Sequence, residues 1–123
     1  MRIFKTKEFA RFARREGIRD ARLREAAERA ERGLVDADLG GGLIKQRVAR
    51  QGEGRRGGYR SLMAFKVGRQ TVFLYGFAKS ERDNIGPDEL DFWRRVARGF
   101  LEMDAAQWQT MTALREIMEV DNG

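Results

Sequence analysis

Four runs of strand-forming residues, separated by glycines, follow one another in the middle of the chain and constrain its fold more than any other feature. They are LVDADLG, LIKQRVAR, GYRSLMAFKVG and QTVFLYGFAKS, between residues 34 and 80. Val, Ile, Leu, Phe and Tyr favour strands. The last two runs predict a hairpin that turns around KVGRQ, where Gly68 can adopt a positive φ. The almost continuously apolar TVFLYGFA predicts a central strand covered on both faces.

Helical patterns stand on both sides of these runs. After a short strand in MRIFKT, Thr6 can cap a helix that Gly17 ends, and a second helix is expected over residues 20–32. Pro87 can begin a third helix, and Asp104 with a glutamine three residues later resembles a capping box. That box would open a last helix carrying Trp108, Met111, Leu114, Ile117 and Met118. This stripe of Trp and Met suits either core packing or a groove for a protein partner.

The expected fold is a single α+β domain over residues 1–123. It would contain a small antiparallel sheet of about three to four strands, with two N-terminal helices packed on it. A C-terminal helical part would follow at about residues 87–120.

Composition narrows the chemistry. The chain has no cysteine and no histidine, which excludes disulfides, thiolate metal sites and the usual proton-transfer side chain near neutral pH. The N-terminus lacks an apolar signal-peptide core, and no run approaches the length of a membrane span, so we expect a cytoplasmic protein without a membrane partner.

Positive charge is concentrated on the predicted strands. Residues 41–82 carry ten Lys or Arg against two acids, whereas residues 83–123 carry four against nine. A solvated basic surface is the ordinary interpretation of such a segment. Here the excess falls on strands and their connecting loop, which favours contact with a nucleic acid. The string GEGRRG matches a dinucleotide-binding pattern, but another strand follows it where that site requires a helix.

The basic set suits the cleavage of RNA. An RNA strand can be cut by its own 2′-hydroxyl, so a protein needs to orient the backbone, stabilise negative charge on phosphorus and move protons. Arginine can hold two phosphate oxygens but is a poor base. A lysine can act as the base if neighbouring cations or burial lower its pKa, and a dense cluster of cations acts in that direction.

The motifs GLIKQRVARQGEGRRGGYRS and VFLYGFAKSERDNI resemble the RelE/ParE superfamily of bacterial toxin-antitoxin toxins, in particular its RelE-like branch. The resemblance covers roughly residues 1–103. It implies a compact α+β toxin that enters the ribosomal A site and cleaves mRNA there as a metal-independent endoribonuclease. It also implies that the toxin uses no metal or organic cofactor, and that a cognate antitoxin covers the toxin and silences it.

The resemblance also assigns roles to residues. Arg60, in GGYR, matches the arginine that is expected to stabilise the charged phosphate in the transition state. Lys45, Arg47, Lys79 and Arg82 match basic positions expected to grip the backbone and transfer protons, with Lys79 or Lys45 as the base. The predicted catalytic residues are thus Arg60, Lys45, Lys79 and Arg82, and the predicted RNA-binding residues are Arg47, Arg50, Arg55, Arg56 and Tyr59. Either tyrosine, Tyr59 or Tyr75, could stack on a base or donate its hydroxyl, although we expect Tyr75 to pack in the core.

The chain departs from the superfamily pattern in one respect. Some members use a histidine or a C-terminal tyrosine in the catalytic step, and this chain has neither a histidine nor a tyrosine after Tyr75. The identity of the acid and the base is therefore open at this level. Two other functions also stay open: a non-enzymatic inhibitor of DNA gyrase, as in the ParE branch, and an RNA- or ribosome-binding module without catalysis.

Overall fold

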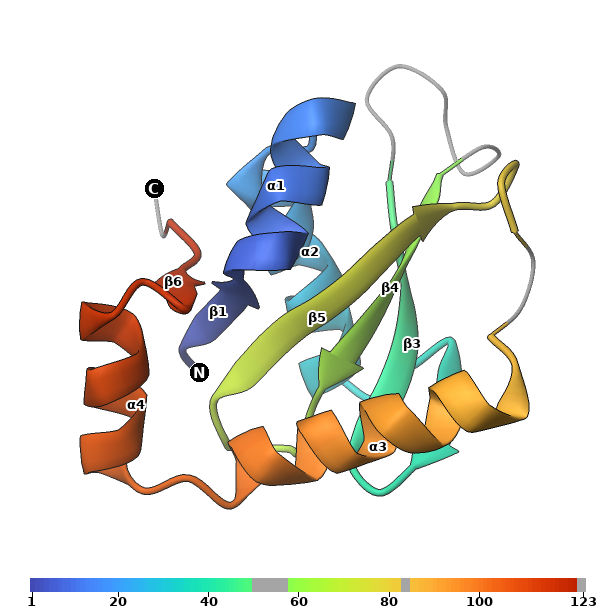
Figure 1. Cartoon of the computed structure of the whole chain (residues 1–123). Coiled ribbons are helices and arrows are strands. Elements are labelled where there is room, and N and C mark those ends of the chain that lie inside the picture. Colours follow the sequence, from blue (N-terminus) through green and yellow to red (C-terminus); the bar gives the residue numbers. More distant parts are fainter. Residues whose placement is uncertain (50–57, 83–84, 122–123) are drawn as a thin grey trace.

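The computed structural model describes residues 1–49, 58–82 and 85–121. The strands in these residues are β1 (Ile3–Thr6), β2 (Ala37–Gly40), β3 (Leu43–Val48), β4 (Tyr59–Ala64), β5 (Thr71–Ala78) and β6 (Ile117–Glu119). The helices are α1 (Lys7–Glu16), α2 (Asp20–Glu31), α3 (Pro87–Leu101) and α4 (Ala105–Ala113). The strands form one sheet in the order β2-β3-β4-β5-β1-β6 (Figure 1).

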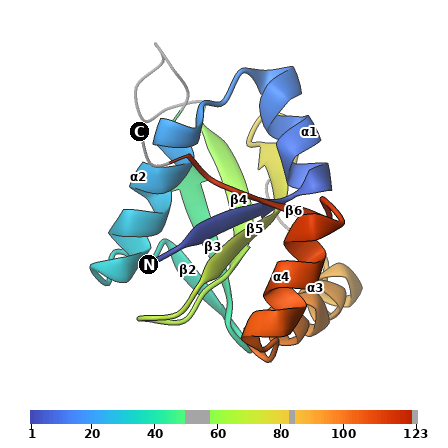
Figure 2. The ribbon, with the colours of Figure 1, turned by 90° about the vertical axis from the view of Figure 1, so that its left-hand side faces the viewer.

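The sheet is larger than predicted and is mixed. Strands β2 to β5 pair antiparallel in chain order, and the predicted β4–β5 hairpin is confirmed, with Gly68 at a φ of 75°. β1 then pairs parallel with β5, and β6 pairs antiparallel with β1 (Figure 2). The α+β class is confirmed, whereas the prediction of an antiparallel sheet of three to four strands was wrong. The strand in MRIFKT is confirmed as β1, but its pairing with β5 and the existence of β6 depend on distant partners, which local sequence does not reveal.

The two N-terminal helices cover one face of the sheet. The Thr6 hydroxyl accepts a hydrogen bond from the Phe9 backbone N–H at 3.1 Å and so caps α1, which ends before Gly17 in a left-handed conformation. The helix buries Phe9 and Phe12, while α2 buries a leucine and three alanines. Their small inward residues bring α2 close to β3. This face is a continuous apolar core.

The C-terminal helices cover part of the other face. α3 begins at Pro87, as predicted, and lies across one end of β3 and β4 (Figure 1). The predicted capping box of α4 is confirmed, because Asp104 and Gln107 exchange side-chain and backbone hydrogen bonds of 2.8 Å. A second apolar core forms here, with Trp108 against Phe4 at 5.0 Å between ring centroids.

The end of the chain differs from the prediction. The last helix ends at Ala113 instead of continuing through Ile117 and Met118, which belong to β6. Arg115, at a φ of 59°, turns the backbone so that Ile117 pairs with Thr6. The apolar residues of β6 thus continue the helical spacing of α4 by chance, although they lie in a strand. Within the described residues, no helix combines the length and apolar character that a membrane span requires.

Candidate RNA-cleavage site on the sheet face beside α3

Side chains of β3 alternate between the two faces of the sheet, and this alternation sorts the basic residues. Gln46 points toward α2, where its amide donates to the Ala26 and Leu34 carbonyls at 3.0 Å each. Lys45 and Arg47, the residues on either side of it, therefore lie on the face that α3 partly covers. Both are half-buried.

The backbone of Arg47 is held in place by charged neighbours. Its N–H donates to the Asp36 carboxylate, and its carbonyl accepts from the Arg29 guanidinium. Arg29 and Asp36 also form an ion pair at 4.0 Å. The Asp36 carboxylate thus binds the Arg47 backbone, and the Arg47 side chain lies on the α3 face.

Arg60 on β4 is the direct cross-strand neighbour of Arg47. Like charges opposite one another on a sheet face destabilise it, so the pair concentrates positive charge here at a cost in stability. The structure brings Lys45, Arg47 and Arg60 onto one face of two adjacent strands.

The predicted role of Tyr59 in RNA binding was wrong. Tyr59 precedes Arg60 on β4 and so faces the opposite way, into the core under α1, where it is 2% exposed. Its ring contacts Phe12 edge-on at 5.6 Å, and its hydroxyl donates to the Glu16 carboxylate at 3.1 Å. A ring enclosed in this way has no face on which a base could stack.

A β-bulge on β5 determines what this strand adds to the site. Leu62 pairs with Tyr75 and Met63 with Phe73, so Leu74 is an extra residue on β5. Phe73 packs in the core under α1, whereas both Leu74 and Tyr75 pack on the α3 side. Without the bulge, strict alternation would place Tyr75 beside Phe73 on the other face. The expectation that Tyr75 packs in the core is thus only half met, because the side chain is half-buried at the site.

Arg82, just after β5, packs against the aromatic residues of that strand. Its guanidinium carbon lies 5.6 Å from the Phe77 ring centroid and 6.0 Å from that of Tyr75. Two hydrogen bonds, of 2.7 and 3.2 Å, join the guanidinium to the Glu89 carboxylate on α3. The bonds to Glu89, and a further one to the Tyr75 hydroxyl at 3.2 Å, raise the pKa of Arg82. Arg82 therefore stays charged and in place.

Of the remaining residues predicted for the site, one lies in a turn and three lie outside the described residues. Lys79 lies in the turn after β5 and is exposed. Arg50, Arg55 and Arg56 lie outside the described residues.

Two side-chain donors on the α3 face are buried without a partner in the described part of the chain. Among the described residues, Arg47 Nε and the indole Nε1 of Trp93 are buried without a hydrogen-bond partner. Trp93, on α3, stacks on Tyr75 at 5.3 Å with 26° between the ring planes. Buried donors are normally satisfied, and unpaired ones at a basic face suit a ligand rich in acceptor oxygens, although Arg24 Nε on α2 is also unpaired. A phosphate backbone has this chemistry. In the described part of the chain, no group of three or more His, Cys, Asp or Glu side chains is arranged to hold a metal ion.

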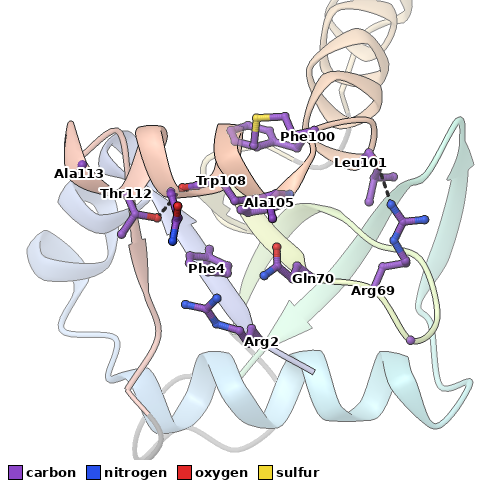
Figure 3. Close-up of a pocket in the computed structure, with 13 residues that line it drawn as sticks. Arg2, Phe4, Arg69, Gln70, Phe100, Leu101, Ala105, Trp108, Thr112 and Ala113 are labelled. Atoms are coloured by element: carbon purple, nitrogen blue, oxygen red, sulfur yellow. Dashed lines mark hydrogen bonds between the residues drawn. The ribbon is translucent and has the colours of Figure 1, made fainter.

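A separate cleft of about 850 Å³ lies between α4, the β4–β5 turn and β1 (Figure 3). Phe4, Phe100 and Trp108 line it, with Arg2 and Arg69 among its polar groups. None of the basic residues predicted for the site within the described ranges lines this cleft. The basic face and the cleft are different surfaces.

The family of the chain follows from its match to a family model. The family model for the RelE toxin of the RelE / RelB toxin-antitoxin system matches residues 1–120. The chain belongs to the RelE toxin family. The match extends beyond residue 103, through α4 and β6, so the segment that resembles the superfamily least in sequence is part of the RelE domain. Comparison with curated protein sequences found no match.

Family membership supports the role of a toxin in a toxin-antitoxin system, for which a cognate antitoxin is the implied partner. RelE family toxins are generally endoribonucleases.

Proposed function

We propose that this RelE family toxin is a metal-independent endoribonuclease that cleaves mRNA in the ribosomal A site and so inhibits translation. The observation that carries the proposal is the arrangement of Lys45, Arg47 and Arg60 on one face of β3 and β4, beside a fixed Arg82. The three cations of β3 and β4 present a surface for a polyanion, and Arg82 borders it with its guanidinium bonded to Glu89. The antitoxin would neutralise this surface in the complex.

The three basic residues of β3 and β4 each take one part of the reaction. The 2′-hydroxyl attacks the adjacent phosphorus, and its proton passes to the amine of Lys45. Arg60 lies on the central of the three strands and binds the phosphate oxygens as negative charge builds on them. Arg47, its cross-strand neighbour, holds the backbone next to the scissile phosphate. The products are a 2′,3′-cyclic phosphate and a free 5′-hydroxyl.

The ribosome supplies what the described surface lacks. The aromatic rings of the site already contact other protein groups, since Tyr75 stacks on Trp93 and the Arg82 guanidinium lies over the Phe77 ring. Stacking platforms are the usual means by which proteins splay and hold single-stranded RNA. A surface that binds mainly phosphates does not by itself determine which nucleotide lies at the cleavage position. An mRNA already positioned in the A site determines it.

Mapping of mRNA 5′ ends after induction of the toxin tests this proposal. We expect cuts within translated frames, and we expect Arg60→Ala to reduce cutting about 100- to 1000-fold. Arg69→Ala is the matched control, because Arg69 lies in the β4–β5 turn at the other end of the strands and donates to the Leu101 carbonyl. This control should cut as wild type does.

Growth arrest with intact transcripts would refute the proposal. DNA damage and filamentation without cuts would instead indicate a gyrase inhibitor. RNA binding that depends on salt, survives Arg60→Ala and leaves growth normal would indicate a binding module without chemistry.

A further inference from the structure

Cleavage of an RNA strand needs a proton donor for the departing 5′-oxygen, and the arginines of the site are too weakly acidic for this task. Histidine is absent from the chain. Among the described residues of β3, β4 and β5 that face α3, one side chain carries a hydroxyl group: that of Tyr75. The β-bulge at Leu74 is what brings Tyr75 to this face.

The Tyr75 side chain is held on three sides. Its ring stacks on Trp93 and contacts Phe77 at 5.9 Å. Its hydroxyl oxygen accepts a hydrogen bond from Arg82 Nη1 at 3.2 Å. Because the oxygen accepts from Arg82, the hydroxyl hydrogen must point elsewhere and is available to donate. The guanidinium also stands ready to stabilise the phenolate that remains after proton transfer.

Strand order places Tyr75 where a proton donor is required. In an in-line displacement, the attacking and departing oxygens lie on opposite sides of phosphorus, so the base and the acid must flank the group that holds the phosphate. Lys45 is on β3, Arg60 on β4 and Tyr75 on β5. The register joins Lys45 to Leu62 and Leu62 to Tyr75. With neighbouring strands about 4.8 Å apart, the Cα atoms of Lys45 and Tyr75 are about 10 Å apart. The buried Leu62 lies between them on β4, so a phosphate held by Arg60, two residues along that strand, would lie beside Leu62 and between the outer ends of the two longer side chains.

We propose that Tyr75 is the general acid of the RNA cleavage and gives its phenolic proton to the departing 5′-oxygen. The inference rests on the proposed function above. The new bond joins the 2′-oxygen to phosphorus while the bond from phosphorus to the 5′-oxygen breaks. The 2′-hydroxyl proton passes to Lys45, the Tyr75 proton passes to the 5′-oxygen, and solvent afterwards restores both groups.

Glu89 has a supporting part as a positioning residue. It binds both Nη atoms of Arg82 and so holds the guanidinium against the Tyr75 hydroxyl. In this arrangement the fork of Arg82 faces Glu89, and a phosphate could take the same two nitrogens only by displacing the carboxylate. Arg82 thus acts mainly through Tyr75, and the phosphate is left to Arg60 and Arg47.

The test is Tyr75→Phe, which keeps the ring and its stacking on Trp93 but removes the hydroxyl. Programmed ribosomes are given mRNA that carries either the normal 5′-oxygen or a 5′-bridging sulfur at the bond that the wild-type toxin cuts. A thiolate departs without protonation, so the variant should cut the sulfur substrate at nearly the wild-type rate. It should cut the normal substrate about 100- to 10,000-fold more slowly.

Two further variants separate catalysis from structure. Tyr59→Phe removes the hydroxyl of the tyrosine on the opposite face and should leave both rates unchanged. Glu89→Gln should slow the cleavage of the normal substrate, leave that of the sulfur substrate nearly unchanged and cause no further loss when it is combined with Tyr75→Phe.

The outcomes separate this inference from the proposed function. Equal slowing of both substrates by Tyr75→Phe, or no slowing of either, would overturn the role of Tyr75 while the toxin remains a nuclease. A wild-type toxin that cuts neither substrate on ribosomes would overturn the nuclease assignment itself.

Discussion

The two faces of the sheet are built from the same strands but differ in how far they are closed. On the α1–α2 face, apolar residues fill the interior from Ile3 at one end to Val48 and Tyr59 at the other. On the α3 face, the apolar core includes the row Leu43, Ala64 and Val72. Nearer the other end of these strands, the same face carries Lys45, Arg47 and Arg60. One face is therefore fully packed, and the uncovered part of the other is the surface that we propose binds RNA.

The two tyrosines of the chain show the same difference between the two faces. Tyr59 gives its ring to the core and its hydroxyl to Glu16, so both parts serve the fold. Tyr75 stacks on Trp93, and its hydroxyl contacts Arg82 at the basic face. Burial of a tyrosine thus indicates its role less well than the group that its hydroxyl meets.

The largest expected effect is on stability. Tyr59→Ala removes a ring that is almost fully buried and leaves a cavity under α1, so the free energy of unfolding should fall by about 3–5 kcal/mol. Tyr75→Ala, on the half-covered face, should lower it by much less. Urea unfolding followed by tryptophan fluorescence measures both. Equal losses would show that the two faces are packed alike.

A smaller effect is expected from the approach of α1 to β5. A Cβ atom on Gly76 would lie 3.0 Å from Phe9 Cε2 and closer still to the Phe12 ring. Gly76→Ala should therefore lower the free energy of unfolding by about 1–3 kcal/mol. The matched control is Gly99→Ala on α3, where no atom lies within 4 Å of the added methyl group. This control should raise the free energy by about 0.5–1 kcal/mol, since alanine favours a helix.

Sequence patterns predicted the local elements of this fold well. The Thr6 cap, the Gly68 turn and the Asp104 capping box each depend on a few adjacent residues, and all three are confirmed. The parallel pairing of β1 with β5 and the existence of β6 depend on contacts between distant segments, which spacing does not encode. Helical periodicity even argued against β6.

The site was predictable to the extent that alternation applies. Period-two spacing in IKQR places Lys45 and Arg47 together, and the chain has no irregularity there. The position of Tyr75 was missed because one extra residue, Leu74, reverses the alternation within an apolar run that offers no signal for it. Glu89 was missed because a carboxylate in the first turn of a helix has a sufficient explanation in the helix dipole.

Some charged residues of the chain are paired with a partner of opposite charge, and Asp20 is one of them. Partial burial opposes ionisation of its carboxyl group, but hydrogen bonds from the Asp121 N–H at 2.9 Å and the Lys5 ammonium at 2.7 Å outweigh it, so the pKa of Asp20 is lowered. Asp20→Asn should lower the free energy of unfolding at pH 7 by about 1–2 kcal/mol.

The pH dependence of the Asp20 effect follows from the direction of its pKa shift. A lowered pKa in the folded state adds stability above the ordinary value of 3.8, and this stability is lost as the pH falls through the folded-state value. The difference between wild type and Asp20→Asn should therefore shrink in unfolding measurements made at increasingly acidic pH. A difference that stays constant down to the most acidic pH would contradict this assignment.

The smallest effect on stability is expected from a cation of the basic face. Arg47 faces Arg60 across the strands, so Arg47→Gln should leave the melting temperature unchanged or slightly raised. It should weaken binding to a single-stranded RNA oligonucleotide and reduce the slope of log affinity against log salt by about 0.7. Fluorescence anisotropy over a salt series measures this slope. An unchanged slope would place Arg47 outside the RNA contact.

The central claim, that position on the α3 face matters and total charge does not, is tested most directly by two triple variants of equal charge. Lys45→Gln/Arg47→Gln/Arg60→Gln empties the basic face, whereas Arg11→Gln/Arg32→Gln/Arg98→Gln removes exposed charges from three helical regions. Each loses three positive charges from a net of +6. On programmed ribosomes, the first variant should be folded but inactive, and the second should cut mRNA at nearly the wild-type rate. Equal activity of the two variants would contradict the account.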